Sequence, residues 1–125
     1  MSGRTLYEKL WDSHVVREYG DGSALLYVDR HLLHEVSTPQ SFVILRDKAA
    51  SARRPLTHLA VPDHAVPTTS RDQPIGDPLA AAQVAALETN SRDFGIPPSA
   101  FTDARQGVVH VVGPELGFTL PGITL

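Results

Sequence analysis

The stretch DPLAAAQVAALETNSRDFG (Asp77–Gly95) decides the fold class, because it predicts a helix between two apolar segments. Asp77 is a suitable N-cap, Pro78 fits the first helical position, and Gly95 can end the helix in the left-handed conformation. The apolar positions fall on one helical face: Ala80, Val84 and Leu87. This segment is therefore the clearest helix of the chain.

Short apolar runs on both sides of this helix predict strands. Leu59–Val61 is ended by Pro62, and Val108–Val112 is β-branched almost throughout, which favours a strand. Strands that alternate with helices are typical of α/β domains. We therefore expect an α/β fold with a mostly parallel sheet.

The N-terminal half continues this alternation. Thr5 and Glu8 form a capping-box pattern, which predicts a helix that fades near His14. A turn at residues 20–22 then precedes the apolar run 24–28, which fits a buried strand, although its periodicity does not exclude a helix.

A second helix is expected after residues 31–36, which continue in an extended conformation. Ser37 opens this helix, Pro39 lies near its first turn, and Gln40 is the capping-box partner of Ser37. The segment from residue 65 to residue 77 is rich in proline and small polar residues and reads as a loop.

Composition excludes several functional classes. The 125 residues suit one domain, and the absence of cysteine excludes disulfides, a thiolate metal site and a cysteine nucleophile. A net charge of −3 gives no electrostatic attraction to nucleic acid or to an anionic membrane. No segment approaches the roughly 20 apolar residues that span a bilayer. We expect a cytoplasmic protein.

Asp63 and His64 directly follow the predicted strand 59–61, where ligands bind in α/β folds. A carboxylate can fix the tautomer of a neighbouring imidazole and make it a better-positioned proton donor. The alternative is a pair of surface loop residues, and local sequence leaves both interpretations open.

Two further residues carry alternatives. His110 interrupts an apolar run. Either its ring nitrogens form hydrogen bonds at the edge of the core, or its side chain points into a cleft. Gln40 either completes a helix cap or helps to bind a carboxylate at a helix N-terminus. His31 and His34 are three residues apart but have no third ligand nearby, so we expect no metal site there.

Four blocks of the sequence, in order and almost from end to end, resemble the start of a known enzyme family. These blocks are Thr5–Asp12 (TLYEKLWD), Leu26–Val36 (LYVDRHLLHEV), Asp63–Thr68 (DHAVPT) and Gly107–Gly122 (GVVHVVGPELGFTLPG). They are similar to the large subunit of 3-isopropylmalate dehydratase, in the aconitase superfamily. The resemblance implies a three-layer α/β/α domain of which residues 1–125 form an incomplete, N-terminal part.

The resemblance also implies an activity, the isomerisation of 2-isopropylmalate and 3-isopropylmalate by dehydration and rehydration in leucine biosynthesis. A [4Fe-4S] cluster would act as the Lewis acid. His64 would protonate the departing hydroxyl with Asp63 as its orienting partner, His110 would line the same site, and Gln40 would contact a substrate carboxylate.

The cluster ligands would lie outside this chain, which has no cysteine. The family also implies a heterodimer with a separate small subunit. We therefore expect the isolated chain to be inactive.

Three alternatives stay open. The chain is a fragment of homoaconitase or of a related hydro-lyase, or it is a non-catalytic remnant that pairs with another protein. The third is a free-standing hydrolase or metal enzyme built on Asp63, His64 and His110, for which the sequence offers no nucleophile or ligand set.

Overall fold

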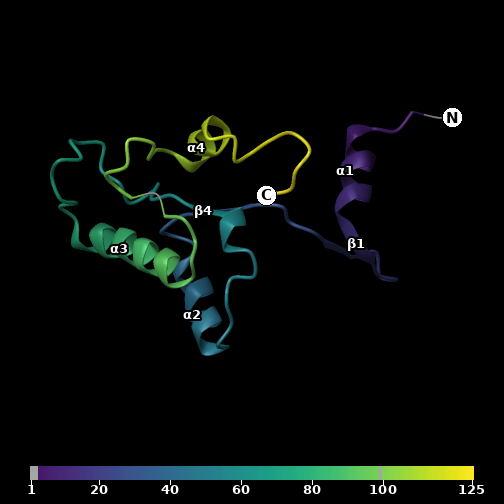
Figure 1. Ribbon diagram of the computed structural model, residues 1–125, viewed down its shortest axis with the longest axis horizontal. Helices are drawn as coiled ribbons and strands as arrows, with labels where there is room; N and C mark the ends of the chain where they lie inside the picture. The colour runs from purple at the N-terminus through teal and green to yellow at the C-terminus, as the bar shows by residue number, and fades with distance from the viewer. Residues whose placement is uncertain (1–2, 99) are drawn as a thin grey trace.

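The computed structural model describes residues 3–98 and 100–125. Its elements are, in chain order, α1 (Leu6–His14), β1 (Val15–Glu18), β2 (Ala24–Leu26), β3 (His31–Leu33), α2 (Pro39–Asp47), the 3₁₀ turn η1 (Pro55–Thr57), β4 (His58–Ala60), α3 (Pro78–Asp93) and α4 (Val109–Glu115). In Figure 1, α1 and β1 lie apart from the remaining helices, and α4 lies across β4 from α2 and α3.

The described strands form two separate ribbons of two strands each. β1 and β2 pair antiparallel, whereas β3 and β4 pair parallel with His31 opposite His58. A single bridge from Ala60 to Pro98 extends the parallel ribbon. The fold is mixed α/β, and the prediction of a mostly parallel sheet is wrong for the described residues. The strands are only three or four residues long, and the run 108–112, which the sequence predicts as a strand, forms the start of helix α4 and cannot join the sheet.

Residues 108–112 form the start of a helix, so the prediction of a strand there is wrong. Val109 and Val112 are buried, whereas His110 and Val111 are exposed, and this spacing of three is helical. The carboxylate of Asp63 accepts a hydrogen bond from the backbone N–H of Val109 at 3.0 Å and so caps the new helix. Tertiary contacts here override the β propensity of valine.

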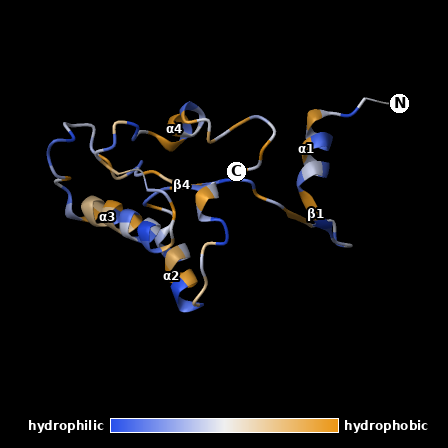
Figure 2. Ribbon diagram, in the orientation of Figure 1, coloured by the Kyte–Doolittle hydropathy of each residue, from blue (hydrophilic) through white to orange (hydrophobic). Residues whose placement is uncertain are grey.

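The helices predicted to begin after Thr5 and after Asp77 are confirmed as α1 and α3. In α1, Thr5 and Glu8 form the reciprocal capping box. In α3, the Asp77 side chain accepts a hydrogen bond from the N–H of Ala80 at 2.8 Å, and Gly95 follows the helix with a φ of 68°. Apolar residues predominate in the first half of α3 and polar residues in the second (Figure 2). Within the described residues, no helix is long and apolar enough to cross a membrane.

Helix α2 is confirmed, but its predicted capping box does not form. Thr38 is the N-cap, and Thr38 and Ser37 both turn back to His34. The Thr38 hydroxyl donates to the carbonyl oxygen of His34 at 2.7 Å, and the Ser37 hydroxyl lies 3.2 Å from Nε2 of the same residue. The start of α2 is thus tied to the segment that follows β3.

The core lies between the parallel ribbon and helices α2 and α3. Its buried residues come from five segments: Leu33, Phe42, Ala60, Leu87 and Ile96. The neighbouring Leu32 points to the other face of the ribbon, where its Cδ1 atom would lie 3.6 Å from a Cβ placed on Gly113 of α4. The strand alternation of Leu32 and Leu33 therefore puts helices on both faces of the ribbon.

The end of the described chain returns to the segment between β2 and β3. The Thr124 hydroxyl donates to the carbonyl oxygen of Tyr27 at 2.8 Å, and the Thr124 N–H donates to Asp29 at 2.8 Å. Asp29 also accepts from Nε2 of His14 at 2.6 Å, so one carboxylate joins α1 to the C-terminal segment.

Candidate functional site

The loops that follow β3 and β4 meet because parallel strands end at the same edge of a ribbon. His34 and Glu35 follow β3, and Asp63 and His64 follow β4 after a short buried stretch. Two segments that are about thirty residues apart in sequence thus form one site.

The buried side chain of Glu35 holds the backbone of this site in place. Its side chain is only 1% exposed, and its carboxylate accepts hydrogen bonds from the backbone N–H groups of Asp63, at 2.8 Å, and of Ala65. Burial raises the pKa of Glu35, but the backbone N–H groups of residues 65, 63, 35 and 64 outweigh it, so the pKa lies below its ordinary value. A buried carboxylate therefore stays charged and fixes the backbone on both sides of His64.

The Asp63 carboxylate is nearly buried and lies beside two polar groups, the N–H of Val109 and the ring of His64. Its side chain is 7% exposed, and Oδ2 accepts from the N–H of Val109 at 3.0 Å. The same oxygen lies 3.7 Å from Nδ1 of His64. The structure therefore places the predicted Asp–His pair together, and it also gives Asp63 a structural role as the cap of α4.

The ring of His64 stacks on a second imidazole, and about half of its side chain is exposed to solvent. Its side chain is 54% exposed. It stacks on the ring of His34, with centroids 4.3 Å apart and planes 23° from parallel. An exposed imidazole that is oriented by a carboxylate and by a stacked ring is suited to carry a proton to or from a ligand.

His110 and Gln40 lie at helix starts and are both exposed. His110 follows Val109, whose N–H binds Asp63, so its backbone lies beside the site. Gln40 is in the first turn of α2. Among the described residues neither side chain makes a hydrogen bond, and the roles predicted for both remain predictions.

Sequence reasoning missed two residues of the site. The sequence pattern indicates His34 only as a possible metal ligand together with His31, and it indicates no role for Glu35. Glu35 lies two residues after β3, but the sequence predicted an extended run through residue 36, so no strand end marked its position. The backbone donors that Glu35 binds become apparent only once the two loops are placed together.

A cavity of about 160 Å³ lies beside Asp63. Arg71 and Gln106 bring polar groups to its wall. The buried Gln106 donates from Nε2 to the carbonyl oxygen of Pro62 at 2.6 Å, while its Oε1 has no partner among the described residues. The Arg71 guanidinium donates to the Gln106 backbone carbonyl at 3.3 Å. The cavity thus combines one cation with an unused acceptor.

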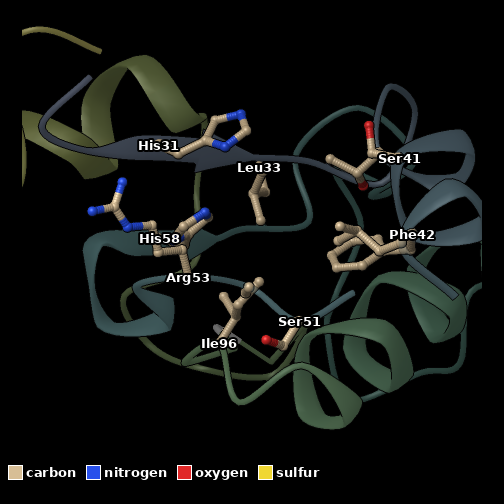
Figure 3. A pocket seen from close by; sticks show the side chains of 11 residues that line it. His31, Leu33, Ser41, Phe42, Ser51, Arg53, His58 and Ile96 are labelled. Carbon is tan, nitrogen blue, oxygen red and sulfur yellow. The ribbon is translucent and has the colours of Figure 1, made fainter. Parts of the chain in front are cut away.

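A second cavity, of about 230 Å³, lies between the parallel ribbon and α2 (Figure 3). Leu33, Phe42 and Ile96 line it, and His31, His58 and Arg53 stand at its side. Burial and the neighbouring His58 lower the pKa of His31. The residues predicted for catalysis lie elsewhere.

Comparisons with known proteins then add one finding. The sequence matches the model of the aconitase family (aconitate hydratase) over residues 8–125. No solved structure matches the chain.

Proposed function

Because the chain belongs to the aconitase family, we propose that this hydro-lyase domain takes part in the interconversion of 2-isopropylmalate and 3-isopropylmalate. The proposal rests mainly on the position of His64, which is exposed, beside a nearly buried Asp63, and stacked on His34. The sequence blocks that resemble the 3-isopropylmalate dehydratase large subunit supply the choice of substrate.

His64 is the proposed proton donor of the dehydration step. The bond between the substrate carbon and its hydroxyl oxygen breaks, the electron pair leaves with the oxygen, and the proton of His64 completes the water molecule. Asp63 keeps the ring oriented during this transfer. On rehydration, His64 takes the proton back. The base that removes the proton from the neighbouring carbon is not assigned to this chain.

Substrate carboxylates need cationic or N–H partners. Gln40 lies in the first turn of α2, where free backbone N–H groups favour anions, and we assign it to one carboxylate. Arg71 lines the cavity beside Asp63 and can neutralise another. His110 is proposed as a further lining group.

The aconitase family uses an iron–sulfur cluster, and the donor groups of this chain do not fit one. There is no cysteine to supply a thiolate. Within the described residues, the only group of three ligand-type side chains consists of two imidazoles and a carboxylate. The thiolates that hold such a cluster would come from polypeptide outside these residues.

A protein partner belongs to the same proposal. Large apolar side chains are exposed at several places on the surface, including Leu6 (70%), Leu56 (80%) and Leu79 (70%). These three lie on different elements, α1, η1 and α3, so they offer a partner separate apolar contacts and not one continuous patch. We propose that a second chain, the small subunit of the isomerase, covers part of this surface.

The binding half of the proposal can be tested on the chain itself. We expect 3-isopropylmalate to shift the backbone NMR signals of His64, Ala65 and Gln40 in ¹⁵N-labelled protein, and 2-isopropylsuccinate, which lacks the hydroxyl, to bind more weakly. His64→Gln should remove the difference between the two ligands, whereas His58→Gln should keep it.

Three results would contradict the proposal. Equal affinities for 3-isopropylmalate and 2-isopropylsuccinate would show that His64 does not interact with the substrate hydroxyl. Stronger binding of homoisocitrate would favour homoaconitase. Isomerase activity of the purified chain, without added iron or protein, would show that neither an iron–sulfur cluster nor a second chain is needed.

A further inference from the structure

We propose that His34, Glu35 and His64 bind a divalent transition-metal ion of the zinc or cobalt type. Each of these residues offers one ligand atom, and the three atoms lie within 4.8 Å of one another. We call these three residues the His–Glu–His cluster. It lies at the site described above, but the inference does not depend on the proposed reaction.

The fold brings the cluster together without help from a metal. His34 and Glu35 follow β3 and His64 follows β4, so the parallel register sets their separation. The backbone N–H groups of Asp63 and Ala65 hold the Glu35 carboxylate in place. The carboxylate is thus positioned before an ion binds, whereas the stacked rings of His34 and His64, 23° from parallel, must turn before both can face one ion.

Each ligand has bonding capacity to spare. The Glu35 carboxylate accepts one hydrogen bond on each oxygen, and each oxygen has a second lone pair. Apart from its stacking on His64, the ring of His34 has two polar neighbours among the described residues, the Ser37 hydroxyl at 3.2 Å from Nε2 and the N–H of Val36 at 3.4 Å from Nδ1. Both partners are exposed and can bind water instead. The His64 ring is 54% exposed and free to turn toward the ion.

Asp63 completes the arrangement as an outer partner. Ligating histidines usually donate their other ring N–H to a carboxylate, which fixes the tautomer. Oδ2 of Asp63 lies 3.7 Å from Nδ1 of His64, beyond hydrogen-bond distance, so this outer contact forms only if Nε2 binds the metal and the turning ring brings Nδ1 closer to the carboxylate. Asp63 is nearly buried, so it holds its position while the exposed histidine adjusts.

Two imidazoles and one carboxylate are a donor set that zinc and cobalt favour, and three protein ligands leave a coordination position open for water. Magnesium and calcium prefer oxygen ligands and should bind poorly. An ion bound to His64 would also prevent that residue from carrying a proton.

The test is a titration of the full 125-residue chain with Zn²⁺ by calorimetry, and with Co²⁺ by visible absorption. We expect one ion per chain, an affinity that falls more than about tenfold in His34→Ala and in His64→Ala, and a loss of about tenfold in Asp63→Asn. His58→Ala, which disrupts the separate His31–His58 pair, should bind as the wild type does. Mg²⁺ should not compete.

A measurement on the wild-type chain guards against variants that fail to fold. Substoichiometric Zn²⁺ should shift the ring ¹⁵N signals of His34 and His64 before those of His31 and His58. The proposal is overturned if no ion binds at one per chain, if His34→Ala and His64→Ala bind as tightly as the wild type, or if the His31 and His58 signals move first. None of these results bears on whether isopropylmalate binds.

Discussion

The buried carboxylate of Glu35 accepts a 2.8 Å hydrogen bond from the backbone N–H of Asp63. This contact joins the segment after β3 to the segment after β4 across 28 residues of sequence. Because Ala65 donates to the same carboxylate, the backbone around His64 is fixed from both sides. The position of the candidate acid His64 therefore depends on the buried carboxylate of Glu35.

Glu35→Gln should destabilise the protein by about 1–3 kcal/mol at neutral pH, because the amide replaces one acceptor oxygen with a donor that faces a backbone N–H. The folded-state pKa of Glu35 is lowered, so its contribution is present above the unfolded value, about 4.3, and is lost as the pH falls through the folded value. The variant should therefore lose less stability on acidification than the wild type, as measured by urea unfolding. Glu115→Gln is the matched exposed control, and an equal loss in both variants would contradict the role of Glu35.

Asp63 substitutions should separate its capping role from its chemical role. Asp63→Asn keeps an oxygen that can accept from the N–H of Val109, whereas Asp63→Ala removes it. We expect Asp63→Ala to cost about 1 kcal/mol of stability, in the range of lost helix caps, and Asp63→Asn to cost less. Thermal unfolding followed by circular dichroism measures the difference. If both variants are equally stable, Asp63 does not cap α4.

The sequence was most informative where local rules decide the structure. The capping box of Thr5 and Glu8 and the Asp77 cap of α3 depend on residues three apart, and both form as predicted. The Asp63–His64 pair was also found, because it follows a strand that could be recognised.

The sequence was least informative where distant residues decide. Val109 and Val112 favour a strand by propensity, yet the Asp63 carboxylate caps them as a helix from 46 residues away. Gln40 could not cap α2, because Ser37 and Thr38 bond to His34 instead. The prediction of one mostly parallel sheet was wrong, since strand length and pairing depend on the packing of the whole chain.

Gly113→Ala should disturb the packing of α4 against the segment that follows it. A Cβ at this position would lie 2.7 Å from Cγ2 of Thr119 and 3.6 Å from Leu32. Overpacking of this kind costs typically about 1–3 kcal/mol. The second substitution Thr119→Ser removes the clashing methyl group and should restore most of the stability in the double variant. Gly20→Ala, where nothing lies within 4 Å, is the control.

The attachment of α1 should depend on pH through His14 and Asp29. Nδ1 of His14 lies 2.7 Å from the carbonyl oxygen of Leu10, and Nε2 lies 2.6 Å from Asp29, so both ring nitrogens donate only when the ring is charged. The Leu10 carbonyl and then Asp29 raise the pKa of His14, and the Thr124 N–H is the main cause that lowers the pKa of Asp29.

The His14 contribution is full below its unfolded pKa of about 6.5 and is lost as the pH rises through the raised folded value. The Asp29 contribution is full above about 3.9 and is lost as the pH falls, so the pair is strongest between about pH 4 and 6.5. Trp11, the single tryptophan, lies on the same helix. Its fluorescence during thermal unfolding should show a higher midpoint at about pH 6 than at about pH 8. Asp29→Asn should reduce that difference, because the Leu10 carbonyl still raises the pKa of His14, and His110→Gln should leave it unchanged. A midpoint that rises with pH in the wild type would mean that the ring is held neutral.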